Sequence, residues 1–177
     1  MNAYTLVMDA SGNVTGPGIY MGGELPSPLP ANEIPCTESQ AKNPMAYQVV
    51  NGQIVENLSY AKTTQIALLQ SAFQQAEQSP VSVTLASGVT TSFGMTPHDW
   101  TKIVGLYSKY VVKGDPIPSN YPLPDVNMVL RTVTKADIDN LFEAGKTQID
   151  NAVSKLASLL ESVNTATTVE AVKSITW

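Results

Sequence analysis

The sequence predicts an α+β fold in two parts, a small β-hairpin region with a proline-rich arm over residues 1–58 and an α+β domain over residues 59–177. Apolar residues alternate with polar ones around turn residues in the first part, which is typical of short strands. In the second part apolar residues recur at helical spacing. We therefore expect the second part to pack a β-hairpin against three to four helices, one of them a long C-terminal helix.

Turn residues and prolines predict the structure of the first part. We expect a strand over residues 4–8, a turn over 9–13 and a return strand from Val14, because Gly and Asn tolerate the backbone of tight turns. Proline lacks a backbone donor and fixes φ, so residues 17–44 should contain neither a helix nor a central strand. We expect an extended, irregular arm there, carrying Pro17, Pro26, Pro28, Pro30, Pro35 and Pro44.

Asn51 and Gly52 stand between two β-rich runs, residues 45–50 and 53–55. The preferred two-residue turn of a β-hairpin needs φ > 0 at both central residues, which Asn and Gly tolerate. The pattern predicts a hairpin that either closes a small sheet or offers an edge to a partner protein.

The second part alternates helices with short β segments, and capping residues mark the helix starts. The elements expected are a helix over 59–78 with one apolar stripe, a hairpin over 81–95, a helix from Thr96 to Gly114, a proline-rich loop over 115–125 and a strand over 127–133.

A very long amphipathic helix begins at the capping box of Thr134 and Asp137 and keeps an apolar face for about eight turns, with Gly145 as its one weak position. It either lies across its own domain or pairs with a second copy, so a homo-oligomer through this helix is the alternative. A short helix begins within residues 167–170. We expect the terminal Trp177 to be buried against the long helix, with an intermolecular role as the alternative.

Charge and cysteine content limit the classes of partner. The net charge is −5, and residues 1–58 hold one cation, Lys42, against five acidic residues. Arg131 is the sole arginine, and no cluster of basic residues could neutralise a phosphate backbone, so we expect no nucleic-acid binding. The start lacks a basic leader, no apolar run approaches the roughly twenty residues of a membrane span, and Cys36 is the sole cysteine. We expect a cytoplasmic origin and no membrane association.

The residues that could carry chemistry are few. His98, the sole histidine, falls in the first turn of a helix, and Cys36 has no other histidine to activate it. Asp137 and Asp139 are explained by the helix dipole and free backbone donors of a first turn. The glycines of residues 16–23 lack the spacing, the lysine and the helix of a phosphate loop. We therefore expect no catalytic, cofactor or metal site.

Short motifs in both parts resemble bacteriophage tail proteins. Asp125-x-Asn127, the run from Val133 to Leu141 and the terminal run from Ala166 to Trp177 resemble a domain of unknown function found at the C-terminus of many phage tail proteins, over about residues 60–177. Residues 4–16, Asn43-Pro-x-x-Tyr47 and residues 50–55 are similar to the front of phage tail fibre assembly proteins.

The resemblance implies a tail fibre assembly chaperone, made in the host bacterial cytoplasm, that binds the receptor-binding tip of the fibre and assists its folding or trimerisation. We expect residues 1–58 to engage the tail fibre protein. The alternative is a structural virion component, such as a baseplate, fibre-attachment or adhesin protein retained on the tail, and a third reading is an enzyme acting on cell-wall glycan. The expected partner-binding residues are Tyr20, Tyr47, Val49, Ile54 and Val55.

Overall fold

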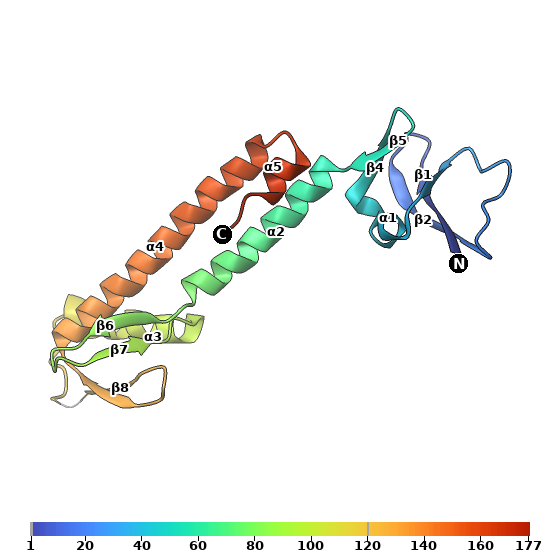
Figure 1. Ribbon diagram of the computed structural model, residues 1–177. Helices are drawn as coiled ribbons and strands as arrows, with labels where there is room; N and C mark the ends of the chain where they lie inside the picture. The colour runs from blue at the N-terminus through green and yellow to red at the C-terminus, as the bar shows by residue number, and fades with distance from the viewer. Residues whose placement is uncertain (1, 120) are drawn as a thin grey trace. The chain divides into compact units, whose positions relative to one another are not determined.

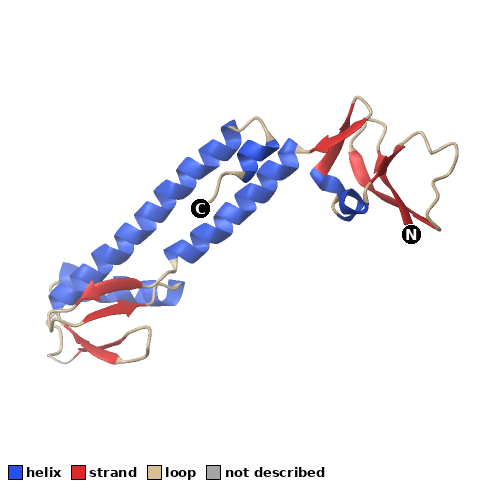
Figure 2. Cartoon of the chain, in the orientation of Figure 1, coloured by secondary structure: helices blue, strands red, loops and turns tan. Residues whose placement is uncertain are grey.

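The computed structural model describes residues 2–119 and 121–177 and has the predicted α+β fold (Figure 1, Figure 2). By packing, the chain divides into two units, Met1–Leu68 with Leu160–Thr176, and Leu69–Leu159 with Trp177. The boundary falls within two helices, α2 (Leu58–Glu77) and α4 (Lys135–Thr165). The division at residue 58 rests on composition and expected function, and it stays a prediction.

The first unit opens with a three-stranded antiparallel sheet in the order β2-β1-β3. Pro17 and Pro35 lie on the two outer strands, where a missing backbone donor can face away from the ladder. Leu6 on the central strand is fully buried. The strands are β1 (Asn2–Met8), β2 (Val14–Met21) and β3 (Glu33–Cys36).

The irregular part of the proline-rich arm is shorter than predicted. Its end joins the sheet as β3, and the exclusion of a helix is wrong for α1 (Glu38–Lys42). No proline lies inside α1, and Thr37 caps it in a reciprocal pair with Gln40: each side chain accepts from the other residue's backbone N–H. Backbone without helix or strand remains over residues 22–32.

The hairpin predicted at Asn51 and Gly52 is confirmed. A 3-10 turn, η1 (Pro44–Ala46), leads into β4 (Tyr47–Val50) and β5 (Gln53–Glu56), which pair antiparallel. The turn residues have φ of +52° and +75°, the left-handed conformation that this turn requires.

The second unit builds its core from a hairpin, β6 (Val81–Thr84) and β7 (Thr90–Phe93), and from helices. Helix α3 (Pro97–Leu106) continues as a π-helical segment, η2 (Tyr107–Val112). Aromatic rings stack beside this core, with centroids 5.4 Å apart for Trp100 and Phe142 and 3.8 Å apart for Tyr107 and Phe142. The deeply buried residues include Phe93, Ile103, Tyr110, Leu123, Val133, Ile138 and Leu141.

The predicted loop over residues 115–125 is wrong at its end, where β8 (Tyr121–Pro124) pairs with β9 (Leu130–Val133). Pro122 and Pro124 alternate with residues that keep their N–H groups, so one side of the strand can still donate to the ladder. The strand expected over 127–133 is shorter, because residues 125–129 form the turn between β8 and β9.

The long helix is confirmed as α4, with 31 residues, and the short one as α5 (Val169–Lys173), capped by Thr168. Trp177 lies against α4, but the expected burial is wrong, because its side chain is only half-buried. The Lys155 ammonium lies 4.9 Å from the centroid of the indole ring, and Phe73 meets the ring edge-on at 6.3 Å. The homo-oligomer through α4 stays a prediction.

Candidate functional site

The free edge of β2 is the most exposed apolar strand surface of the first unit. Ile19 is 58% exposed and Met21 is 87% exposed, and as residues i and i+2 they lie on one face of the strand. Among the described residues β2 is hydrogen-bonded to one strand, β1, and no strand is hydrogen-bonded to its other side, although η1 and β4 also come close to β2. Ile19 and Met21 were not among the contact residues predicted from the sequence. Their alternation with Tyr20 after Pro17 was the available signal.

Tyr20, a predicted contact residue, lies on the other face of the sheet, half-buried. Its hydroxyl donates to Glu33 Oε2 at 2.9 Å, and the Thr5 hydroxyl donates to the same oxygen at 2.6 Å. The hydrogen bond to the Glu33 carboxylate raises the pKa of Tyr20, because it favours the protonated phenol. The Tyr20 hydroxyl is thus engaged within the sheet, and its ring is the part left to meet a partner.

The other four predicted residues lie on the β4–β5 hairpin but not on one face. Val49 pairs with Ile54, and Tyr47 pairs with Glu56, which places these residues on the same face. Val55 pairs with Gln48 and therefore projects from the opposite face. The structure brings Tyr47, Val49 and Ile54 together, and it separates them from Val55.

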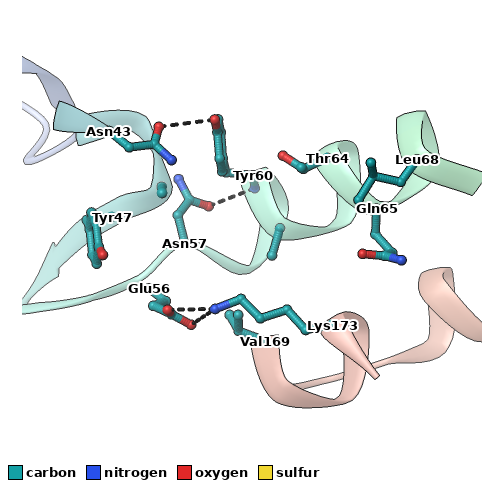
Figure 3. Close-up of a pocket in the computed structure, with 12 residues that line it drawn as sticks. Asn43, Tyr47, Glu56, Asn57, Tyr60, Thr64, Gln65, Leu68, Val169 and Lys173 are labelled. Atoms are coloured by element: carbon teal, nitrogen blue, oxygen red, sulfur yellow. Dashed lines mark hydrogen bonds and ion pairs between the residues drawn. The ribbon is translucent and has the colours of Figure 1, made fainter. Parts of the chain in front are cut away.

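Tyr47 also lines a cavity of about 320 Å³ within the first unit (Figure 3). One side of it is the start of α2, including Tyr60, Thr64 and Leu68, and another is α5. This volume lies at the lower end of the range of small-ligand pockets. The cavity was not predictable from the sequence, because its walls come from segments more than a hundred residues apart.

A salt bridge crosses this cavity. Lys173 Nζ on α5 lies 2.7 Å and 2.9 Å from the two carboxylate oxygens of Glu56 at the end of β5. The hydrogen bond to Glu56 raises the pKa of Lys173. Both side chains are substantially exposed, so the pair contributes little to stability, but it cancels the two charges that line the cavity.

Within the described part of the chain, the fold does not bring together the residue types that could carry catalysis. His98 is exposed in the first turn of α3. Cys36 is half-buried on β3, and burial raises the pKa of its thiol, which lowers the thiolate fraction. Asp137 acts as a cap: its carboxylate accepts from the Thr134 N–H and hydroxyl and from the Ala86 N–H. The glycines from residue 16 lie in strand β2 and the turn after it, and Asp139 is half-buried near the start of α4.

Within residues 2–119 and 121–177, no group of three or more His, Cys, Asp or Glu side chains is placed to hold a metal ion. None of the helices described there combines the length and the apolar character needed to cross a membrane.

The second unit contains one buried polar centre that the sequence analysis did not identify. Asp125 is 3% exposed, and its carboxylate accepts from the Thr91 hydroxyl, the Arg131 Nε and the backbone N–H groups of Asn127 and Val129. Burial alone would raise its pKa, but these four donors outweigh burial and lower the pKa to about 2. The centre fixes the turn between β8 and β9.

That turn is apolar and exposed. Val126, Met128, Val129 and Leu130 all lie open to solvent, and Met128 is 79% exposed at a φ of +61°. Asp125 thus holds a cluster of exposed apolar residues, interrupted by Asn127, on the surface of the second unit.

No protein-family model matches the sequence, and the searches of curated proteins and of solved structures found no match either.

Proposed function

We propose that the protein is a bacteriophage tail fibre assembly chaperone, which binds the receptor-binding tip of the fibre and assists its folding or trimerisation. The free apolar edge of β2 is the observation that supports this proposal. An unpaired edge strand is a template for another β-strand, and Ile19 and Met21 add apolar contact area beside it.

A strand of the unassembled fibre pairs with β2 through the backbone, while its side chains pack on Ile19 and Met21. β-rich chains that await their partners expose unpaired strands and aggregate easily, so temporary pairing protects them. Pro17 has no backbone N–H, so the row of hydrogen-bond donors along β2 is interrupted there. This interruption limits the addition of further strands to the sheet. The Tyr20 ring and the hairpin residues Tyr47, Val49, Ile54 and Val55 supply further contacts.

Co-expression with the tail fibre protein tests the proposal. The wild-type chain should keep the fibre soluble and co-purify with it. The double variant Ile19→Lys/Met21→Lys should reduce the yield of complex by about tenfold or more, because two charges oppose burial of the edge. Val104→Lys/Val112→Lys is the matched control, since these exposed valines lie in the second unit.

Two results would count against the proposal. One is equal recovery of soluble, trimeric fibre with the β2 variant or with residues 1–58 deleted. The other comes from mass spectrometry of purified particles. A chaperone that acts in the host cytoplasm should be absent or strongly sub-stoichiometric there, whereas stoichiometric amounts would identify a structural tail component.

A further inference from the structure

The cavity beside Tyr47 is an elongated groove along one stripe of α2. The stripe begins at the helix cap, Asn57, and ends at Leu68, eleven residues later. At 1.5 Å per residue it extends about 16 Å, which matches about five residues of extended chain at 3.3 Å each. The stripe residues at helical spacing are Asn57, Tyr60, Ala61, Thr64, Gln65 and Leu68.

Within residues 2–119 and 121–177, no acceptor is paired with the side-chain NH₂ groups of Asn43 and Asn57, which line the groove. Asn57 Oδ1 accepts from the Tyr60 N–H, and Asn43 Oδ1 accepts from the Tyr60 hydroxyl. These two bonds fix the oxygen of each amide and leave each NH₂ group free. Figure 3 shows the amide nitrogens of Asn43 and Asn57 pointing into the same space. Two converging N–H donors suit a carbonyl oxygen, because its two lone pairs can accept from both.

The charged residues and the apolar surface of the groove narrow the class of ligand further. The charged residues of the lining, Glu56 and Lys173, are paired with each other, so a charged ligand would have to compete with this ion pair for a countercharge. Leu68, 58% exposed, stands at one end of the stripe, and the Tyr47 ring lines the groove near the hairpin. Both offer apolar contact to side chains.

We propose that this groove binds an extended, uncharged peptide segment of about five residues, with a backbone carbonyl of the segment accepting from the amides of Asn43 and Asn57. No residue of β2 lines this groove, and the inference goes beyond the proposed function because the segment is defined by its chemistry and not by its parent protein.

An array of synthetic pentapeptides with acetylated and amidated ends tests the inference, in three sets that are uncharged, carry one Lys or carry one Asp. The wild-type protein should bind members of the uncharged set, and adding either charge should weaken binding by about tenfold. Thr64→Trp should abolish this binding by filling the groove. Thr63→Trp should preserve it, because Thr63 is also exposed on α2 but does not line the groove.

Asn43→Asp provides a second variant that does not alter α2. It keeps an acceptor for the Tyr60 hydroxyl, replaces the donor nitrogen by oxygen, and should weaken binding by about tenfold. The inference is overturned if the wild type binds no peptide, if binding ignores or prefers charge, or if Thr64→Trp and Asn43→Asp bind as the wild type does. No fibre is present in the array, so the outcome is independent of co-purification with the fibre.

Discussion

Asp125 shows how one residue can fix a whole turn. Its carboxylate is buried, yet four donors hold it in the charged form with a pKa of about 2. A carboxyl with a depressed pKa in the folded protein contributes stability that is present above its ordinary value and lost as the pH falls. For Asp125 that loss falls between pH 3.8 and about 2.

We predict that Asp125→Asn unfolds at lower denaturant than the wild type near neutral pH. The amide cannot accept from all four donors, and its own NH₂ group would face them. The difference in the free energy of unfolding should shrink as the pH falls from 3.8 towards about 2, where the wild-type carboxyl takes up its proton. Urea titrations over this range measure it, and a difference that does not vary with pH would contradict the assignment.

Gly18 is required by close packing rather than by backbone conformation. A Cβ at this position would overlap the Thr5 hydroxyl and approach the Glu33 carboxylate, whereas a Cβ at Gly16 on the same strand meets nothing within 4 Å. We predict that Gly18→Ala lowers the free energy of unfolding by about 1–3 kcal/mol. Gly16→Ala should change it little, and thermal unfolding of the two variants compares them. Equal stability would show that the sheet adapts to the methyl group.

At the residue scale, the sequence predicts the turns and caps that are formed by residues close together in the chain. The turn at Asn51 and Gly52, the cap at Thr96 and the box at Thr134 each involve residues within a few positions, and each is present. The burial of Asp125 could not be predicted in this way, because one of its four donors, Thr91, precedes it by 34 residues and meets it only in the folded unit.

At the scale of elements, Gly145 lies in the interior of α4, a position that helix propensity alone disfavours for glycine. A Cβ at Gly145 would lie 2.6 Å from Met95 Cε and 2.6 Å from Trp100 Cζ3, so the glycine allows α4 to pack closely on this part of the core. Gly105 in α3 is also helical, and a Cβ there meets nothing within 4 Å. Comparing the two glycines therefore distinguishes the effect of close packing, present at Gly145, from the effect of helix propensity, present at both.

We predict opposite effects of the same substitution at these two sites. Gly105→Ala should stabilise the protein by about 0.5–1 kcal/mol, because alanine restricts the unfolded chain and favours helix. Gly145→Ala gains the same propensity but should destabilise the protein by about 1–3 kcal/mol through overlap with Met95 and Trp100. Chemical denaturation measures both, and stabilisation by Gly145→Ala would mean that the Met95 side chain moves aside.

Elements with strong periodicity or clear caps were predictable, whereas those decided by distant partners were not. The apolar face and the capping box identified α4 over almost its full length. β8 was missed because Pro122 and Pro124 argue against a strand, and only the register with β9 shows that alternate positions remain able to pair. α1 was missed because prolines on both sides masked a short stretch with a good cap.

At the scale of the whole molecule, composition and packing divide the chain differently. Composition changes near residue 58, but the first unit also takes in the C-terminal residues 160–176. Lys62 Nζ donates to the Asn164 carbonyl at 2.7 Å, and the Gln65 amide donates to the Ile175 carbonyl at 2.5 Å. Such contacts join residues more than a hundred positions apart, and no local pattern encodes them.

Trp177 belongs to the second unit, although the residues before it belong to the first. We predict that Trp177→Ala lowers the free energy of unfolding by about 1–2 kcal/mol, because it removes the ring contacts with Phe73 and Lys155. Thr176→Ala, at an exposed neighbouring position, should leave stability near that of the wild type. Thermal unfolding compares the variants, and equal midpoints would show that the indole is not docked in solution.

Because Met21 is exposed, the rate of its oxidation reports whether a strand is bound along β2. Thioethers open to solvent are oxidised by peroxide before buried ones, so Met21 and Met128 should form sulfoxides early and Met95, 2% exposed, late. A strand bound along β2 would slow the reaction at Met21 and leave the rate at Met128 unchanged. Peptide mass mapping after brief peroxide treatment could then follow docking in a crude mixture without a label or a tag.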